Sequence, residues 1–239
     1  MTDQMQRIVL ASRPEGASTL DNFRLEGADI TKPGQGEVLV RTLFLSLDPY
    51  MRGRMSAAKS YSAPVELDET MGGGTVSEVV ESNADHLKPG DIVLGMGGWA
   101  SHAVLPGNQV QKIDPSVAPV STALGVLGMP GFTGWYGLTQ IGQPKEGETL
   151  VVGAATGPVG SMVGQLAKAK GLRAVGVAGG EDKCRFAVEE LGFDACIDHR
   201  AHDTADSLQA ALKAETPDGI DIYFENVAGK TLEAVLPLM

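Results

Sequence analysis

The first half of the chain contains short runs of β-forming residues, separated by segments rich in glycine and proline. The predicted strands cover residues 7–10, 37–47, 75–80, 91–94, 101–105 and 110–113. Turn-forming segments such as Pro33-Gly34-Gln35-Gly36 and Lys88-Pro89-Gly90-Asp91 lie between them. Many short strands with few helical stretches predict a barrel-like or sandwich-like β domain.

After about Ala118 the pattern changes to strands that alternate with helices. Strands are predicted over residues 149–152, 173–178, 194–197 and 220–224, and helices over residues 157–170, 181–191 and 205–214. In the first of these helices, Val159, Met162, Val163 and Leu166 recur at the spacing of one helical face. Alternation of this kind predicts βαβ units and a parallel sheet.

Composition narrows the function classes. Hydrophobic residues make up 43% of the chain and charged residues 21%, which is typical of a globular protein with a sizeable core. The net charge of −11 argues against a nucleic-acid or anionic-membrane surface, so we predict neither partner. Only two cysteines occur, and neither a signal-peptide core nor a membrane-spanning apolar run is visible. We therefore expect a cytoplasmic protein.

The segment Ala154-Ala155-Thr156-Gly157-Pro158-Val159-Gly160 follows the first strand of the second half and opens a helix. A pyrophosphate needs exposed backbone N–H groups and a favourable dipole, and a glycine-bearing turn at a helix N-terminus supplies both. By itself such a pattern is weak, because glycines are common in turns. The strand before it, the helix after it and a second strand about twenty residues later strengthen the prediction of a dinucleotide site.

The end of that second strand usually distinguishes NAD from NADP sites. Here the strand runs into Ala178-Gly179-Gly180 without an acidic residue, and Lys183 follows within one helical turn. Lys183 can reach the 2′-phosphate of NADP, although it can also be read as a solvated surface lysine. Glu181 or Asp182 could instead accept a hydrogen bond from a ribose 2′-hydroxyl. The sequence favours NADPH as the cofactor.

Several stretches along the chain carry a resemblance to one family. They are Leu47-Asp48-Pro49-Tyr50-Met51-Arg52-Gly53-Arg54-Met55, Gly128-Met129-Pro130-Gly131-Phe132-Thr133, the glycine turn, Ala178-Gly179-Gly180-Glu181-Asp182-Lys183 and Phe224-Glu225-Asn226-Val227-Ala228-Gly229. With them the whole chain resembles the medium-chain dehydrogenase/reductase superfamily. Within it, the chain resembles the zinc-independent prostaglandin reductase branch, with bacterial NADPH-dependent curcumin reductases as the nearest relatives.

The resemblance implies an α/β protein of two domains. Residues 1–122 would form a GroES-like β-barrel domain that carries substrate and catalytic residues. Residues 123–239 would form an NADP-binding Rossmann domain, a doubly wound parallel sheet that is truncated at its C-terminal side. Members of the family continue beyond the position of Met239, so we expect the chain to be either a truncated product or one completed by a part outside this sequence.

Carried over position by position, the resemblance implies a set of cofactor contacts. Gly157, Pro158, Val159 and Gly160 would line the pyrophosphate, and Gly179 lies in the matching segment at the end of the second strand. Lys183 would contact the 2′-phosphate, and Asn226 would lie beside the nicotinamide. His199 replaces a tyrosine that is frequent in the family, so that contact would come from an imidazole whose charge depends on pH. Thr133 is expected to face the cofactor or, alternatively, to cap a helix. Gly180 and Ala228 depart from the usual serine and glycine.

No metal site is predicted. None of His86, His102, His199 and His202 is paired with a cysteine at ligand spacing, and Met71-Gly72-Gly73-Gly74 replaces the Gly-His-Glu segment of zinc-dependent relatives. A metal-free reductase needs an acceptor whose developing charge is delocalised, as in an α,β-unsaturated ketone or aldehyde. We predict Tyr50 as the catalytic hydrogen-bond donor; a tyrosine packed beneath a turn is the alternative.

The main hypothesis is therefore an NADPH-dependent reductase of the C=C bond in small enones or enals. Two alternatives remain open: a quinone oxidoreductase, against which the Asp48-Pro49-Tyr50-Met51-Arg52 stretch argues, and a catalytically inactive NADPH-binding module, suggested by the early C-terminus. Because relatives are often dimers, a homodimer is an expected assembly.

Overall fold

The computed structural model describes residues 4–239 and divides the chain into two compact units. The first unit ends at Leu124 and the second runs from Gly125 to Met239. Within the described part of the chain, no helix has the length and apolar character needed to cross a membrane.

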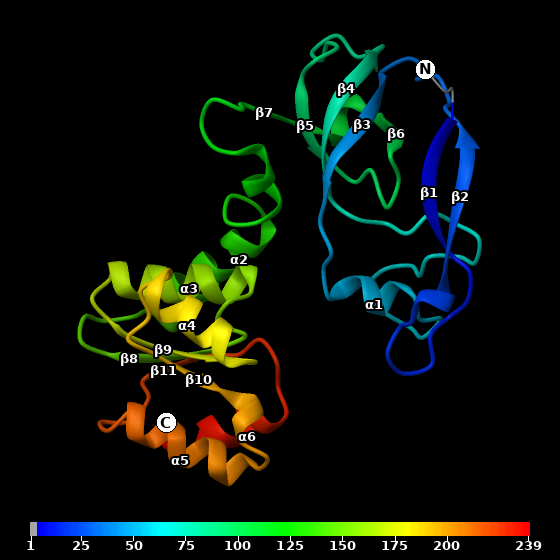
Figure 1. Cartoon of the computed structure of the whole chain (residues 1–239). Coiled ribbons are helices and arrows are strands. Elements are labelled where there is room, and N and C mark those ends of the chain that lie inside the picture. Colours follow the sequence, from blue (N-terminus) through cyan, green and yellow to red (C-terminus); the bar gives the residue numbers. More distant parts are fainter. Residues whose placement is uncertain (1–3) are drawn as a thin grey trace. The chain divides into compact units, whose positions relative to one another are not determined.

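The first unit is built mainly from antiparallel strands (Figure 1). A five-stranded sheet has the order β6-β3-β4-β5-β7, and β1 and β2 form a separate two-stranded sheet. The strands are β1 (Gln4–Leu10), β2 (Phe23–Asp29), β3 (Glu37–Leu45), β4 (Thr75–Ser82), β5 (Ile92–Gly95), β6 (His102–Pro106) and β7 (Gln111–Ile113). All six strands predicted in this half of the chain are present, and β2 is an additional strand.

Two apolar clusters form the core of the first unit. One packs Val38 and Val40 of β3 against Val79 of β4 and Val93 of β5. The other surrounds the short helix α1 (Tyr50–Arg54) and contains Met51, Met55, Leu10 and Met71. Met71 is fully buried, as expected for an apolar residue that fills a gap in the core.

The second unit is built around a four-stranded parallel sheet of order β10-β9-β8-β11. The strands are β8 (Thr149–Gly153), β9 (Arg173–Ala178), β10 (Ala195–Asp198) and β11 (Ile222–Phe224). All of them run in the same direction, so the sheet has an amino edge, where the strands begin, and a carboxyl edge, where they end. In order along the chain the strands are arranged 3-2-1-4, the arrangement of a Rossmann sheet. The predicted fold class is thus confirmed.

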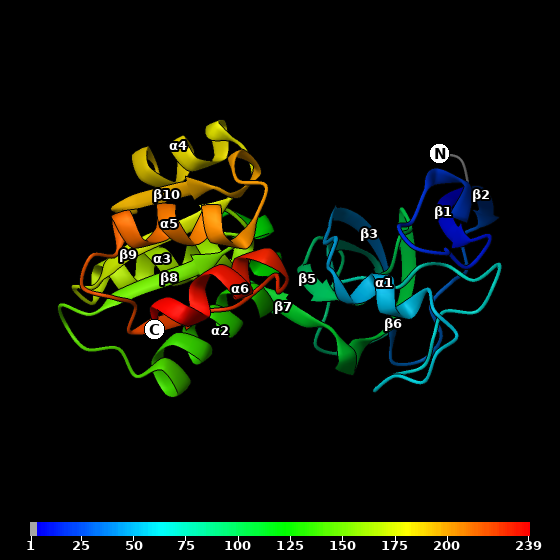
Figure 2. The same cartoon turned by 90° about the horizontal axis from the view of Figure 1, so that it is seen from below.

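Helices cover both faces of this sheet. In Figure 1, α2, α3 and α4 lie on one face, and α5 and α6 lie on the other; Figure 2 shows the second group from below. Their bounds are α2 (Met129–Tyr136), α3 (Pro158–Ala169), α4 (Glu181–Glu189), α5 (Ala205–Glu215) and α6 (Lys230–Val235). Alternate residues of β8 serve the two faces: Leu150 and Val152 pack with α3, whereas Val151 packs with α5 and α6.

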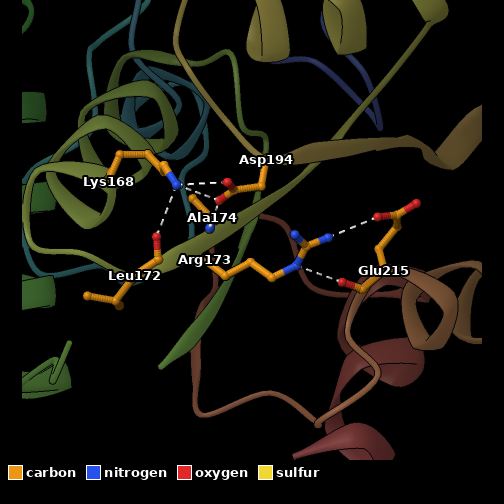
Figure 3. A network of polar contacts seen from close by, with 6 residues as sticks. All are labelled: Lys168, Leu172, Arg173, Ala174, Asp194 and Glu215. Atoms are coloured by element: carbon orange, nitrogen blue, oxygen red, sulfur yellow. Dashed lines mark hydrogen bonds and ion pairs between the residues drawn. The ribbon is translucent and has the colours of Figure 1, made fainter. Parts of the chain in front are cut away.

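Ion pairs and hydrogen bonds join the elements at the amino edge of the sheet (Figure 3). The Lys168 ammonium near the end of α3 contacts both carboxylate oxygens of Asp194, at 2.7 and 2.9 Å. Asp194 also accepts a hydrogen bond from the backbone N–H of Ala174 at 2.7 Å. Beside them, Arg173 of β9 pairs with Glu215 of α5 at 3.0 Å. The charges in this network therefore have partners within the fold.

Candidate functional site

The turn between β8 and α3 brings the backbone close to itself. Ala154 has a φ of +49°, a left-handed conformation that is uncommon for a residue other than glycine. Gly157 is the N-cap of α3, and its N–H donates to the Ala154 carbonyl at 2.8 Å. A Cβ at Gly160 would lie 2.3 Å from that same carbonyl oxygen, so only glycine allows this approach. Pro158 follows at the first position of the helix, where its missing N–H has no cost.

A pocket of about 390 Å³ lies at the carboxyl edge of the sheet. Its walls come from the segments that follow β8, β9, β10 and β11. The lining residues are Ala154, Thr156, Gly157, Val177, Ala178, Gly179, Lys183, His199, Arg200, Val227, Ala228, Lys230 and Thr231. Four of the predicted cofactor residues are thus brought together: Gly157, Gly179, Lys183 and His199. None of the lining residues carries a carboxylate.

Asp198, the last residue of β10, holds two loops of the pocket in place. Its Oδ1 accepts hydrogen bonds from the backbone N–H of Gly180 at 2.7 Å and of Arg200 at 2.9 Å. These two bonds lower the pKa of the Asp198 carboxyl below its ordinary value. Gly180 has a φ of +107°, a conformation that strongly favours glycine. The serine that is frequent in the family at Gly180 would be strained in this backbone.

Lys230, the first residue of α6, fixes the segment that carries His199. Its ammonium donates to the His199 carbonyl at 2.8 Å and also to the His202 carbonyl. The sequence analysis missed both Lys230 and Arg200. Arg200 directly follows His199 in the sequence, so its basic side chain could have been predicted as a second phosphate contact. Lys230 reaches the pocket only through tertiary contacts.

Other predicted cofactor residues do not line this pocket. The first turn of α3 contains Pro158, Val159 and Gly160, which follow Gly157 and do not line the pocket. Thr133 is exposed within α2, and its hydroxyl donates to the Met129 carbonyl at 2.7 Å. The Asn226 side chain donates to the Gly153 carbonyl at 3.0 Å, which places it at the carboxyl end of β8. The cofactor contacts expected of these residues stay predictions.

The two acidic residues that could have indicated NAD lie outside the pocket. Glu181 and Asp182 form the first turn of α4, and neither lines the pocket. Asp182 forms an ion pair with Arg185 one turn further along the helix. The basic residues that line the pocket are Lys183, His199, Arg200 and Lys230, and the Lys230 ammonium is bonded to two backbone carbonyls. Together with the glycine turn at the N-terminus of α3, these donors fit a dinucleotide that carries an additional phosphate.

Tyr50 belongs to the first unit, where it begins α1. Its ring packs against the cluster around Met51, and the Arg54 guanidinium lies 5.9 Å from the ring centroid. Partial burial raises the pKa of the Tyr50 hydroxyl, the nearby Asp48 carboxylate raises it further, and Arg54 opposes the rise. The phenol therefore keeps its proton at neutral pH and can act as a hydrogen-bond donor.

Two aromatic residues of the first unit, Trp99 and Tyr61, differ in exposure. Trp99 is half-buried and stacks on Phe23 with 5.3 Å between ring centroids, so it is part of the core packing. Tyr61 is 85% exposed, and the Arg54 guanidinium lies 5.0 Å from its ring centroid. Over residues 4–239, no group of three or more His, Cys, Asp or Glu side chains is arranged to hold a metal ion.

Comparison with family models matches both parts of the chain. Residues 6–113 match a model described as the N-terminal domain of oxidoreductase. Residues 158–239 match a model described as zinc-binding dehydrogenase.

Among curated proteins, the chain is 58% identical to an NADPH-dependent curcumin reductase of Escherichia coli, over 98% of this chain and 67% of that protein. It is 42% identical to prostaglandin reductase 1 of Rattus norvegicus, over 93% and 65%. It is also 42% identical to an NADP(+)-dependent 2-alkenal reductase of Nicotiana tabacum, over 85% and 59%. The chain thus spans 59% to 67% of the length of these three relatives.

Among solved structures, the chain superimposes on CurA from Vibrio vulnificus in complex with NADPH. The TM-score is 0.91 and the sequence identity 55%, over 98% of this chain and 68% of that one.

Proposed function

The chain belongs to the medium-chain dehydrogenase/reductase superfamily, in the branch of the prostaglandin and curcumin reductases, and on this basis we propose that it is an NADPH-dependent oxidoreductase that reduces C=C bonds. The proposed substrates are α,β-unsaturated ketones or aldehydes. The relatives that are named for reduction of curcumin and of 2-alkenals support this substrate class.

The observation that carries the proposal is the pocket at the carboxyl edge of the parallel sheet. It combines a glycine turn at a helix N-terminus with the basic residues Lys183, His199 and Arg200, and it lacks a carboxylate among its lining residues. An NAD site would instead present an acid to the ribose 2′-hydroxyl. The pocket therefore favours a ligand with a 2′-phosphate.

In this proposal Gly157 and the first turn of α3 hold the pyrophosphate through backbone N–H groups and the helix dipole. Lys183 and His199 hold the 2′-phosphate. Asp198 and Lys230 keep the two loops in place through the hydrogen bonds described above. The bound cofactor supplies a hydride for the β-carbon of the substrate.

Hydride transfer to the β-carbon of an enone leaves an enolate, whose α-carbon then takes a proton from a phenol or from water. Before this protonation, the negative charge on the enolate oxygen needs a hydrogen-bond donor. We assign this role to Tyr50. Its raised pKa keeps the hydroxyl protonated, and its ring is held by the core cluster around α1. The donor is thus preorganised, because the side chain is fixed before the substrate binds.

The test is consumption of NADPH by the purified protein, followed through the absorbance of the reduced nicotinamide. A 2-enone, a 2-enal and a quinone are offered as acceptors, each with NADPH and with NADH. We expect turnover of the enone and the enal with NADPH. Turnover of the quinone alone would identify a quinone oxidoreductase and contradict the proposal, and binding of NADPH without turnover of any acceptor would identify an inactive binding module.

A further inference from the structure

Arg200 differs from the other arginines of this chain in its contacts. Eight of the nine arginines donate a side-chain hydrogen bond to another group within the described residues: Arg7, Arg13, Arg24, Arg41, Arg52, Arg54, Arg173 and Arg185. Within residues 4–239, only the Arg200 guanidinium has neither a hydrogen bond nor an ion pair. Its donors are therefore free for a ligand.

The backbone holds Arg200 at a defined position in the pocket. The residue lies in a single turn of 3-10 helix, His199–Ala201, directly after β10. Its N–H is bound by Asp198, and Lys230 fixes the neighbouring carbonyl of His199. The place of Arg200 is thus set by the sheet and by α6, even though its side chain is exposed.

The guanidinium lies directly over the backbone of Gly179. A Cβ at Gly179 would be 3.0 Å from Nε and 3.4 Å from Cζ of Arg200, and 2.9 Å from Nε2 of His199. The absence of a side chain at Gly179 therefore gives the guanidinium and the imidazole space side by side at the end of β9. This is the position where a dinucleotide site distinguishes the ribose 2′-hydroxyl from the 2′-phosphate.

Within residues 4–239, no carboxylate forms an ion pair with the Arg200 guanidinium, although the charge of Arg200 contributes to the lowered pKa of Asp198. The Oδ1 atom of Asp198 accepts two backbone N–H groups, and Asp182 pairs with Arg185. Lys183 provides a compact point charge from the first turn of α4, whereas a guanidinium presents a planar set of donors that matches two phosphate oxygens. The two cations are chemically complementary.

We infer that Arg200 is a specificity-determining residue, which binds the 2′-phosphate of NADPH through its guanidinium opposite Lys183. This inference rests on the proposed function, because it assigns a further contact to the same cofactor site. It makes discrimination against NADH depend on two segments of the chain, the one after β9 and the one after β10.

The experiment measures binding of adenosine 2′,5′-bisphosphate and of adenosine 5′-monophosphate to the full chain by calorimetry. These two nucleotides differ only in the 2′-phosphate, and neither needs a competent nicotinamide site. Wild type is compared with Arg200→Ala, Arg200→Lys and the control Lys213→Ala, which removes an exposed positive charge from α5, outside the pocket. Circular dichroism establishes that each variant is folded.

We expect wild type to prefer the bisphosphate. Arg200→Ala should weaken bisphosphate binding by about tenfold or more, because hydrogen bonds between a guanidinium and a phosphate are stronger than those between neutral groups. Binding of the monophosphate should change by less than about twofold. Arg200→Lys should recover part of the loss, and Lys213→Ala should resemble wild type. An unchanged preference in Arg200→Ala would overturn the role of Arg200 alone. No preference in wild type would overturn the proposed NADPH site, and with it this inference.

Discussion

The two edges of the parallel sheet in the second unit use charge in opposite ways. At the amino edge, Lys168 and Arg173 are paired with Asp194 and Glu215, and the network joins α3, β9, β10 and α5 (Figure 3). At the carboxyl edge, the side chains of Lys183 and Arg200 have no partner within the described residues, and both line the pocket. Charges at the amino edge therefore stabilise the fold, whereas those of Lys183 and Arg200 at the carboxyl edge are available to a ligand.

The difference does not come from the number of acidic residues at each edge. Asp198 and Glu225 both lie at the carboxyl edge, but their oxygens accept backbone N–H groups. Burial alone would raise the pKa of Glu225, yet hydrogen bonds from the Tyr223 hydroxyl and from the Val227 and Ala228 backbone lower it. These carboxylates shape the loops and leave the cations unpaired. The presence of an acidic residue near a phosphate-binding pocket therefore does not show that it pairs with the basic residues there. The hydrogen-bond partners of its oxygen atoms must be known.

The largest expected effect follows from breaking the turn that frames the carboxyl edge. In Gly160→Ala the new Cβ would meet the Ala154 carbonyl oxygen at 2.3 Å, so α3 must move away from β8. We expect the free energy of unfolding to fall by about 3 kcal/mol and NADPH binding to be lost. Urea denaturation and calorimetry measure the two effects. Gly53→Ala is the control because its Cβ would meet nothing within 4 Å; similar losses in both variants would contradict the prediction.

Removing one unpaired cation tests the carboxyl edge directly. Lys183→Ala should weaken NADPH binding by about 10- to 100-fold, equivalent to about 1.4–2.7 kcal/mol. Binding of NADH and the free energy of unfolding should stay close to wild type, because the ammonium has no partner in the fold. Lys213→Ala on α5, which also removes an exposed lysine, is the matched control. A comparable loss of NADH affinity would argue against a 2′-phosphate contact.

Removing one paired charge tests the amino edge. Asp194→Ala leaves the Lys168 ammonium and the Ala174 N–H without their acceptor, so the free energy of unfolding should fall by about 1–2 kcal/mol. The ratio of NADPH to NADH affinity should not change. Thermal or urea denaturation measures the first quantity, and calorimetry the second. Asp218→Ala, an exposed acid in the turn before β11, is expected to have little effect. A change in the ratio of NADPH to NADH affinity would mean that residues of the amino edge also contribute to cofactor preference.

The smallest expected effect is a pH dependence confined to the amino edge. Burial alone would raise the pKa of Asp194, but hydrogen bonds from Lys168 and Ala174 hold it below its ordinary value of 3.8. A carboxyl whose pKa is lowered in the folded state stabilises the fold above the ordinary value and loses this effect as the pH falls through the folded pKa. The stability difference between wild type and Asp194→Asn should therefore shrink below pH 3.8. A difference that stays constant in acid would refute this account.

Much of the second unit could be predicted from its apolar pattern. The strand over residues 173–178 was predicted with both ends correct, because the five residues after Arg173 are all buried and the glycines that follow end the run. In the first unit, β2 was not predicted. It contains only two large apolar residues, Phe23 and Leu25, and it pairs with β1 through backbone hydrogen bonds and the Arg7–Glu26 ion pair.

The parts of the candidate site that follow shortly after predicted strands could be predicted from the sequence. Gly157, Gly179 and Lys183 could be identified because each follows a predicted strand within five residues. His199 was identified through the family resemblance, as the replacement of a frequent tyrosine. The role of Lys230 could not, since it depends on carbonyl groups of His199 and His202, which are distant in the sequence. The binding roles of Thr133 and Asn226 stay predictions, because neither residue lines the pocket. The role of Tyr50 also stays a prediction, because this residue belongs to the first unit.

The position of Arg200 and Lys183 outside the charge network of the fold has a consequence for evolution. Under the proposed assignment, substitutions at these two positions would change which cofactor is favoured without removing a side-chain interaction within the described residues. During evolution, the preference for NADPH or NADH would therefore be able to change without compensating mutations elsewhere in the fold. The segments after β9 and β10 are therefore the ones to exchange when a reductase of this kind is engineered to use NADH.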